Sequence, residues 1–389
     1  MIGLLSKIFI KGNGDPKEAD VRRAYGILCS VTGICLNILL FAGKYLAGVL
    51  SGSIAIMADA FNNLSDAGSS LITLIGFKFA GIKADAEHPF GHGRFEYISG
   101  FVVAVAILLM GVELAKSSVA KIISPSPVDA SLLSVVILCI SVGVKLYMCA
   151  YNRTIGKKID SSAMKATAMD SLSDAVATSM VLVAILVARF THINVDGWCG
   201  ALVAVFILFA GYNAAKDTIS PLLGQPPAPE LIEQIKKITL SYKEIVGIHD
   251  LVVHDYGPGR IMISLHGEVS GDGNIFELHD VIDRAEKELK EKLGCEAVIH
   301  MDPIAANNEE VDILKNEVNT LVKTIDEKLS IHDFRMVKGP THTNLIFDVV
   351  VPFEMKMTDK QVTEDIERLV RERWNNYFVV LSVDHSYVL

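Results

Sequence analysis

The sequence predicts a helical membrane domain with six transmembrane helices, followed by an α+β ferredoxin-like domain that is duplicated. Three observations support this fold class. Six apolar stretches in the first 224 residues are each long enough to cross about 30 Å of hydrocarbon. Charge is divided unevenly, with 18 basic against 15 acidic residues in 1–224 and 18 against 30 in 225–389. A pattern of strands and helices then occurs twice in the acidic part.

The predicted transmembrane helices lie in the amino-terminal part of the chain. They cover residues 25–50, 53–80, 96–118, 130–151, 163–189 and 197–217. Basic residues cluster before the first stretch and between the fourth and fifth, which favours a cytoplasmic amino terminus by the positive-inside rule; they are Lys17, Arg22, Arg23, Arg153, Lys157 and Lys158. With an even number of spans, both termini are expected in the cytoplasm, and the protein in the plasma or inner membrane.

Four segments follow from these patterns: an amino-terminal tail (1–22), a membrane domain (23–224) and two soluble repeats (225–305 and 306–389). The proline-rich segment 220–230 predicts a linker, because proline does not continue a helix. After it we expect a helix at 230–243, strands at 247–256 and 260–269 joined by the turn GPG, a helix at 277–294 and a strand at 296–302. This αββαβ order is typical of a ferredoxin-like layer of sheet and helices.

The second soluble repeat is recognised by a matching segment. IHDFRMVKGPTHTNLIFDVVVP, from Ile331, matches IHDLVVHDYGPGRIMISLHGEV, from Ile248. The second copy retains His332 and adds His342 and His385, but it lacks counterparts of most of the metal ligands that are expected in the first copy. We therefore expect this repeat to have a structural or dimer-extending role.

Two of the apolar stretches carry oxygen-bearing side chains at helical spacing. MADAFNNLSDAGSS places Asn62 and Asp66 four residues apart, and KATAMDSLSDAVATS places Asp170 and Asp174 at the same spacing. Residues four apart share one face of a helix. An ionisable side chain near the bilayer centre costs about 2.5–3.5 kcal/mol, so three aspartates favour a bound cation or shared protons. The alternative is that these residues lie at helix ends, where they are exposed to solvent or cap the helix.

No motif for nucleotide or peptide hydrolysis accompanies these carboxylates in the sequence, which has no GxxxxGK[ST] loop, no DKTG-like segment and no HExxH. Transport would therefore draw on an ion gradient. Carboxylates that bind metal only when deprotonated can exchange it for protons. We expect a transporter rather than an enzyme, with no catalytic residues, no resident cofactor and no nucleic-acid partner.

Histidines form two further groups. The loop KADAEHPFGHGRFE places Asp85, His88 and His92 within reach of one cation, although a loop histidine is often only solvated. In the first soluble repeat five histidines fall within 52 residues, followed by Asp302; they are His249, His254, His266, His279 and His300. Imidazole with carboxylate is a usual ligand set for transition metals, which favours a metal site over structural histidines. We expect His254 to stay outside it.

These motifs together resemble the cation diffusion facilitator family. The resemblance covers about residues 20–305 and is carried by ADAFNNLSD, the DxxxD of the fifth stretch, HPFGHGRFE, HDLVVHDYGPGR, SLHGEV and IHMDP. It implies a homodimer in the lipid bilayer that exports divalent metal ions in exchange for protons. By position it implies a transport site at Asn62, Asp66, Asp170 and Asp174, a surface site at Asp85, His88 and His92, and a regulatory site at the dimer interface at His249, His266, His279, His300 and Asp302.

The expected substrate is Mn²⁺. Zinc-transporting members of that family place histidine at the position of Asn62 or Asp170, whereas the all-oxygen set of this chain resembles the manganese branch. Oxygen ligands suit Mn²⁺, but the Irving–Williams order still favours Zn²⁺ at a given site. A Zn²⁺ or Fe²⁺ exporter therefore stays an alternative, as does a membrane-anchored metal sensor. Gly224 stands where some members carry an acidic partner for the base at Arg94, so we do not expect that dimer contact in this chain.

Overall fold

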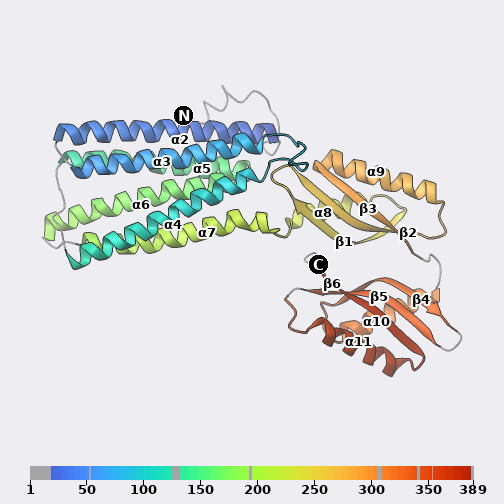
Figure 1. Cartoon of the computed structure of the whole chain (residues 1–389). Coiled ribbons are helices and arrows are strands. Elements are labelled where there is room, and N and C mark those ends of the chain that lie inside the picture. The colour runs from blue at the N-terminus through green and yellow to red at the C-terminus, as the bar shows by residue number, and fades with distance from the viewer. Residues whose placement is uncertain are drawn as a thin grey trace. The chain divides into compact units, whose positions relative to one another are not determined.

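The computed structural model describes residues 19–51, 54–124, 132–191, 195–304, 309–339, 342–352 and 354–386. They belong to two compact units (Figure 1). The first, called the helical unit, comprises Met1–Gln225 and the turn Asp255–Arg260. The second, called the sheet unit, comprises Pro226–His254 and Ile261–Leu389. The expected amino-terminal tail lies almost wholly outside the described residues.

The helical unit is built from long, mostly apolar helices. They are α2 (Ala19–Ser51), α3 (Ile54–Ala80), α4 (Phe95–Ile123), α5 (Leu132–Lys158), α6 (Ser162–Thr191) and α7 (Asp196–Leu223). Among the described residues, five of them, all except α3, are long and apolar enough to cross a membrane. The remaining helix, α3, carries Asn62 and Asp66.

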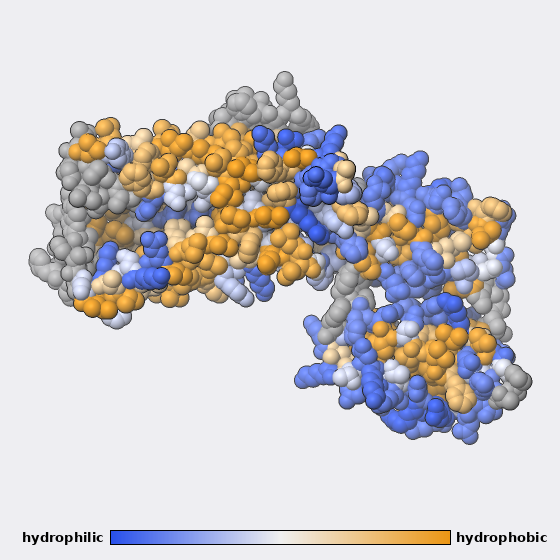
Figure 2. All heavy atoms as spheres, in the orientation of Figure 1, coloured by the Kyte–Doolittle hydropathy of each residue, from blue (hydrophilic) through white to orange (hydrophobic). Residues whose placement is uncertain are grey.

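Large hydrophobic side chains cover the outside of the helical unit, where a soluble domain would be polar. Leu39, Leu109, Leu202 and Phe209 each leave about two thirds of their surface exposed. Figure 2 shows that the visible face of this unit is largely hydrophobic, while hydrophilic side chains concentrate on the sheet unit. Contiguous exposed apolar surface of this kind marks contact with a membrane or another protein. Together with the helix lengths, it supports a multi-pass membrane domain.

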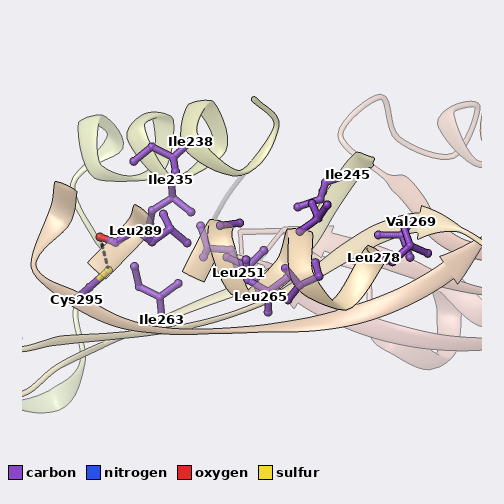
Figure 3. Close-up of a cluster of buried hydrophobic side chains, with 14 residues drawn as sticks. Ile235, Ile238, Ile245, Leu251, Ile263, Leu265, Val269, Leu278, Leu289 and Cys295 are labelled. Atoms are coloured by element: carbon purple, nitrogen blue, oxygen red, sulfur yellow. Dashed lines mark hydrogen bonds between the residues drawn. The ribbon is translucent and has the colours of Figure 1, made fainter. Parts of the chain in front are cut away.

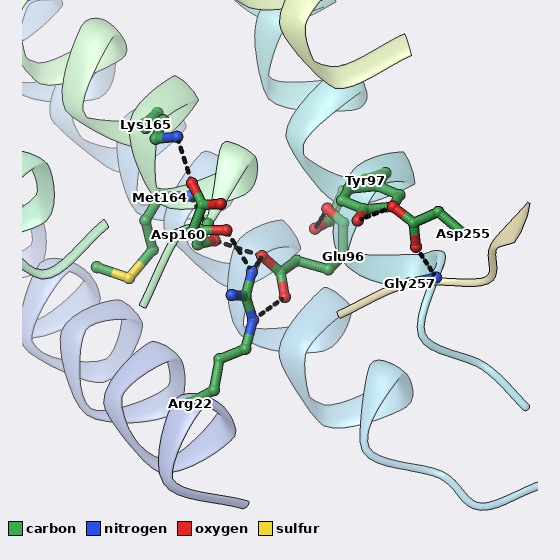
Figure 4. A network of polar contacts seen from close by, with 10 residues as sticks. Arg22, Glu96, Tyr97, Asp160, Met164, Lys165, Asp255 and Gly257 are labelled. Atoms are coloured by element: carbon green, nitrogen blue, oxygen red, sulfur yellow. Dashed lines mark hydrogen bonds and ion pairs between the residues drawn. The ribbon is translucent and has the colours of Figure 1, made fainter. Parts of the chain in front are cut away.

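A buried ion pair joins three of the helices at one end of this unit. Arg22 of α2 donates from Nη2 to Glu96 Oε1 of α4 at 2.6 Å, and both side chains are less than a tenth exposed. The same guanidinium donates to the carbonyl of Asp160, and Ser161 Oγ donates to Glu96 (Figure 4). The sequence analysis counted Arg22 among the free basic charges that set orientation. In the structure, Glu96 neutralises the charge of Arg22 inside the protein, so the predicted orientation depends on the other basic residues.

The linker between the units is shorter than the sequence predicts. Helix α7 continues through Pro221 to Leu223 and ends at Gly224, whose φ of +91° is a left-handed conformation that glycine adopts without strain. One proline in the last helical turn removes only one backbone hydrogen bond, so it does not end the helix. Helix α8 (Pro229–Thr239) then begins with proline at its first turn, where the missing N–H has no helical acceptor.

The first repeat of the sheet unit has the expected αββαβ order. After α8 come β1 (Ile245–Asp255), β2 (Ile261–Ser270), α9 (Ile275–Leu293) and β3 (Cys295–Ile304), with the sheet order β1-β2-β3 and β2 parallel to β3. Apolar side chains of both helices pack on one face of the sheet, and Ile235, Leu265 and Leu289 meet in this core (Figure 3). The opposite faces of the strands stay free for polar side chains.

The second repeat has the same order and a core of its own. It contains α10 (Glu309–Lys323), β4 (Ser330–Lys338), β5 (Thr343–Pro352), α11 (Asp359–Arg373) and β6 (Tyr377–Ser386), with the sheet order β4-β5-β6. Helix α11 begins with a capping box between Thr358 and Gln361. The hydrophobic core of the second repeat contains Phe347, Val318 and Ile366. The predicted fold class, a helical membrane domain followed by two α+β layers, is therefore confirmed.

Candidate metal sites

The membrane carboxylates meet between α3, α5 and α6. Asp66 and Asp170 are both buried, and Asp174 lies one helical turn after Asp170, on the same face of α6. Within the described residues the three carboxylates do not form a compact cage, since the groups of ligand atoms that lie within 4.8 Å of one another are found elsewhere. Another side chain lies between them.

That side chain is Lys145 of α5. Its Nζ lies 2.6 Å from Asp66 Oδ2 and 2.7 Å from Asp174 Oδ2, and only 3% of the side chain is exposed. A second lysine, Lys44 of α2, is also buried, and its positive charge acts on Asp66. The arrangement is a buried cation site whose cation in this structure is an ammonium group. A divalent ion that uses both carboxylates would have to displace Lys145.

Asn62 is the fourth member of the predicted membrane set, and in the structure it lies outside the group that Lys145 forms with Asp66 and Asp174. It lies one turn before Asp66 on α3, and its side chain is exposed. Asn62 and Asp66 thus remain on neighbouring turns of one face, but only the aspartate reaches Lys145. The sequence analysis missed Lys145 altogether. Its position inside the apolar stretch 130–151 was the available signal, because a lysine at membrane depth is rarely without a function.

The loop between α3 and α4 brings its three predicted ligands together. Ligand atoms of Asp85, His88 and His92 all lie within 4.8 Å of one another. Gly91 makes the chain turn back at φ +80°, and the N–H of Gly91 donates to the carbonyl of His88. The backbone N–H of His88 donates to Asp85 Oδ1 at 2.7 Å, and this hydrogen bond lowers the pKa of Asp85. The carboxylate is therefore charged and ready to bind a cation.

The same loop packs on the turn Asp255–Arg260, which belongs to the helical unit. Arg94 donates to the carbonyl of Asp255 at 2.6 Å and lies over the ring of Tyr256. Tyr97 donates to Asp255 Oδ2 at 2.9 Å (Figure 4), and Phe90 stacks on Tyr256. In this chain Arg94 thus binds a backbone carbonyl and an aromatic ring. It therefore has partners although Gly224 offers no acidic side chain.

The first soluble repeat brings three of its predicted ligands together. His249 on β1, His266 on β2 and Asp302 on β3 have ligand atoms within 4.8 Å of one another. Asp302 Oδ2 lies 2.9 Å from His266 Nδ1 and 3.2 Å from His249 Nε2. The parallel register sets His266 beside His300, whose Nε2 lies 3.2 Å from the other oxygen of Asp302. We call His249, His266 and Asp302 the first triad.

Two histidines of the first repeat lie outside this triad. His279 is on α9, its side chain is 69% exposed, and it pairs with Asp283 one turn later. Among the described residues, the compact groups of ligand atoms do not include His279, which the resemblance places in the same site. His254 also lies outside the compact groups found in the described residues, as expected.

Aspartates near His249 were not predicted as ligands. Asp250 Oδ2 lies 3.3 Å from His249 Nδ1. Burial acts to lower the pKa of His249, but Asp250 and the other carboxylates nearby outweigh it and raise that pKa. The interaction with His249 in turn lowers the pKa of Asp250. The site therefore attracts positive charge, either a proton on the ring or a metal ion.

Comparison with known proteins agrees with this architecture. The family model of the cation efflux transmembrane domain matches residues 30–223, and that of the cytoplasmic domain of cation efflux proteins matches residues 227–304. An uncharacterized transporter of Methanocaldococcus jannaschii is 32% identical over 277 residues, which cover 71% of this chain and 96% of that protein. The cation-efflux pump FieF of Citrobacter koseri is 25% identical over 287 residues, covering 73% and 95%.

Neither family model extends into the second repeat, which begins after residue 304. Over the rest of the chain, two family models match in the expected order, and relatives are aligned over nearly their whole length. The chain therefore belongs to the cation efflux family, and it is a multi-pass membrane protein that transports divalent cations rather than an enzyme.

Proposed function

We propose that this protein exports Mn²⁺ in exchange for protons, with Asn62, Asp66, Asp170 and Asp174 as the transport site. The observation that carries the proposal is the buried ammonium of Lys145 between Asp66 and Asp174. It supports the view that these carboxylates accept a cation inside the membrane. Lys145 binds the two carboxylates, and we expect a metal ion entering the site to take its place.

Proton exchange follows from the same groups. Carboxylates bind a metal ion only when deprotonated, so protons and metal compete for Asp66, Asp170 and Asp174. When the metal leaves, the ammonium group of Lys145 returns to the carboxylates. It thereby lowers the free-energy cost of charged carboxylates without a bound metal ion in a low-dielectric site. The gradient of protons then supplies the free energy for export.

The choice of Mn²⁺ rests on ligand chemistry. The proposed set contains only oxygen ligands, which suit Mn²⁺, and it has no imidazole or thiolate, which raise affinity for Zn²⁺. Export of Zn²⁺ or Fe²⁺ is the alternative, because the names of the relatives leave the metal unspecified. The relatives are named as transporters and pumps, which argues against the sensor hypothesis.

Flux measurements with purified protein in proteoliposomes test this proposal. With a pH gradient across the membrane, we expect Mn²⁺ to move faster than Zn²⁺, Fe²⁺ or Co²⁺, and Mn²⁺ flux to stop when the gradient is dissipated. Asn62→His and Asp170→His are expected to raise the ratio of Zn²⁺ to Mn²⁺ flux by about tenfold, because imidazole is the softer ligand. Leu64→His is the control, since it adds an imidazole to α3 on another face. An unchanged ratio in both variants would show that this site does not select the metal.

Lys145→Met tests the role of the ammonium group. Without the tethered cation, the carboxylates of Asp66 and Asp174 repel each other and bind Mn²⁺ more strongly. We expect the KM for Mn²⁺ to fall by about tenfold, which corresponds to about 1.4 kcal/mol, and the maximal flux to fall because release becomes slow. Lys165→Met is the matched control, because Lys165 pairs with Asp160 at an exposed position. A KM equal to that of the wild type would contradict competition between Lys145 and the metal.

The remaining expectations belong to the same proposal. Asp85, His88 and His92 form a surface site that loads metal next to α3, and the first triad with His300 forms a regulatory site. The protein works as a homodimer in the plasma or inner membrane, with both termini in the cytoplasm. Arg153, Lys157 and Lys158 support this orientation, as they stand at the end of α5. His279, exposed on α9, is free to reach a second copy of the chain.

A further inference from the structure

The second repeat carries the same three positions as the first triad. In the parallel ladders Ile261 pairs with Cys295 and Thr343 pairs with Tyr377, so the two ladders have the same offset. Counted along them, His266 corresponds to Asp348 and Asp302 corresponds to Asp384. His249 and His332 are each followed by an aspartate in a left-handed conformation, at φ 51° and 50°.

This equivalence corrects the expectation that the second repeat lacks counterparts of the ligands. An ungapped comparison of the repeats sets Val349 opposite His266. The segment from His332 to Asp348 is one residue shorter than the segment from His249 to His266, and the difference lies before the ladder begins. The pairing of strands restores the alignment, and we call His332, Asp348 and Asp384 the second triad.

The second triad has the geometry of a metal site. Ligand atoms of its three residues all lie within 4.8 Å of one another, and His332 Nε2 lies 3.5 Å from Asp384 Oδ2. The side chain of His332 is only 10% exposed, and in the described part of the chain neither of its ring nitrogens makes a hydrogen bond. A buried polar group without a hydrogen bond costs about 1–3 kcal/mol. A bound cation would remove this cost.

The two triads adjoin each other inside the sheet unit. The rings of His249 and His332 lie 4.5 Å apart at 31°. Asp250 stands between them, with Oδ1 3.5 Å from His332 Nε2 and Oδ2 3.3 Å from His249 Nδ1. His249, like His332, makes no hydrogen bond through its ring nitrogens among the described residues. One carboxylate is thus placed to contact ligands of both repeats.

Negative charge is concentrated where the repeats meet. Four imidazoles, of His249, His266, His300 and His332, face four carboxylates, which are Asp250, Asp302, Asp348 and Asp384. A nearby cation, Arg335, donates from Nε and Nη2 to the two carboxylate oxygens of Asp333. Each repeat has its own hydrophobic core, so the described contact between the triads is polar. Divalent cations would turn repulsion between these carboxylates into attraction.

We propose that the second triad is a metal site, and that it forms with the first triad a two-cation centre that clamps the two repeats of one chain together. Imidazole and carboxylate ligands suit Zn²⁺, and also Mn²⁺, Fe²⁺ and Co²⁺. Asp250 bridges the two ions or supports both ligand histidines. The repeat that no family model covers would thereby supply, from the same chain, a second ligand set for the metal-binding face of the first repeat. This inference does not depend on which metal crosses the membrane.

Zinc binding by the full-length protein in detergent tests this proposal. After treatment with chelator, the number of bound Zn²⁺ ions per chain is measured by calorimetric titration and by elemental analysis of the desalted protein. We expect His332→Ala and Asp384→Asn each to lose about one ion per chain relative to the wild type, and Asp302→Asn combined with Asp384→Asn to lose about two. His385→Ala is the control, because His385 pairs with Asp359 at an exposed position of the same repeat.

A second measurement reports on the clamp itself. Hydrogen exchange is followed by mass spectrometry for peptides that cover β1 and β4, with and without Zn²⁺. We expect Zn²⁺ to slow exchange in both strands. His332→Ala is expected to abolish the effect in β4 and to reduce it in β1, which belongs to the other repeat and keeps the ion of the first triad. Equal numbers of bound ions in the wild type, His332→Ala and Asp384→Asn would overturn the proposal. So would zinc-dependent protection of β1 that is as large in both variants as in the wild type. Since both readouts measure binding, they are unaffected if the protein fails to transport Mn²⁺.

Discussion

Asp66→Ala is expected to reduce Mn²⁺ flux into proteoliposomes by at least about 100-fold, because even residues that only support a metal ligand cost 10–100-fold in affinity or activity when they are removed. Asp66 is buried and binds Lys145 directly, so its loss removes a ligand and an ionisable group from the centre of the site. The fold is expected to persist, since Lys145 keeps its contact with Asp174 at 2.7 Å.

Two further variants make the result for Asp66 specific. Asp66→Asn preserves the shape of the side chain and removes only its charge, and we expect the same loss of flux. Asp217→Asn removes an exposed carboxylate from α7, and we expect normal flux. Elution volume and melting temperature in detergent show whether each variant is folded. Mn²⁺ flux above one tenth of the wild-type value in a folded Asp66→Ala protein would remove Asp66 from the transport pathway.

Glu96→Ala is expected to destabilise the protein by about 3–5 kcal/mol, which is the usual cost of removing one partner of a buried ion pair. Among the described residues, it leaves the buried guanidinium of Arg22 with only the carbonyl of Asp160 as an acceptor, and it removes the acceptor of Ser161. The ends of α2, α4 and α6 lose the contact that joins them. A fall in melting temperature and in the denaturant midpoint, measured in detergent, reports this loss.

The ion pair has two informative controls. Glu113→Ala removes an exposed carboxylate from the same helix, and we expect a change within about 0.5 kcal/mol. Arg22→Met combined with Glu96→Leu replaces both charges by apolar groups, which often costs little in a buried site. We expect this double variant to be clearly more stable than Glu96→Ala alone. If the double variant were as unstable as Glu96→Ala, the loss would come from packing rather than from the unpaired charge.

Much of the architecture was predictable because it depends on local patterns. Apolar stretches of sufficient length predicted six helices, and each observed helix overlaps its stretch. Alternating residues and a GPG turn predicted β1 and β2 to within a few residues. Errors concern the ends of elements, as with α7, which continues past Pro221, because a single lost hydrogen bond is a small term against the packing of a long helix.

The sequence by itself identified candidate residues: spacing of four placed Asp170 and Asp174 on one face of a helix, and motifs picked out the loop histidines and the histidine group that contains the first triad. Tertiary structure alone decided which charges meet. Lys145 reaches Asp66 across 79 residues, and Arg22 reaches Glu96 across 74. The second triad emerged only from strand pairing, since a one-residue difference hid it in the sequence. Local patterns reflect the period of a helix or strand. Contacts between residues of different elements depend on tertiary packing, which cannot be read from a local pattern.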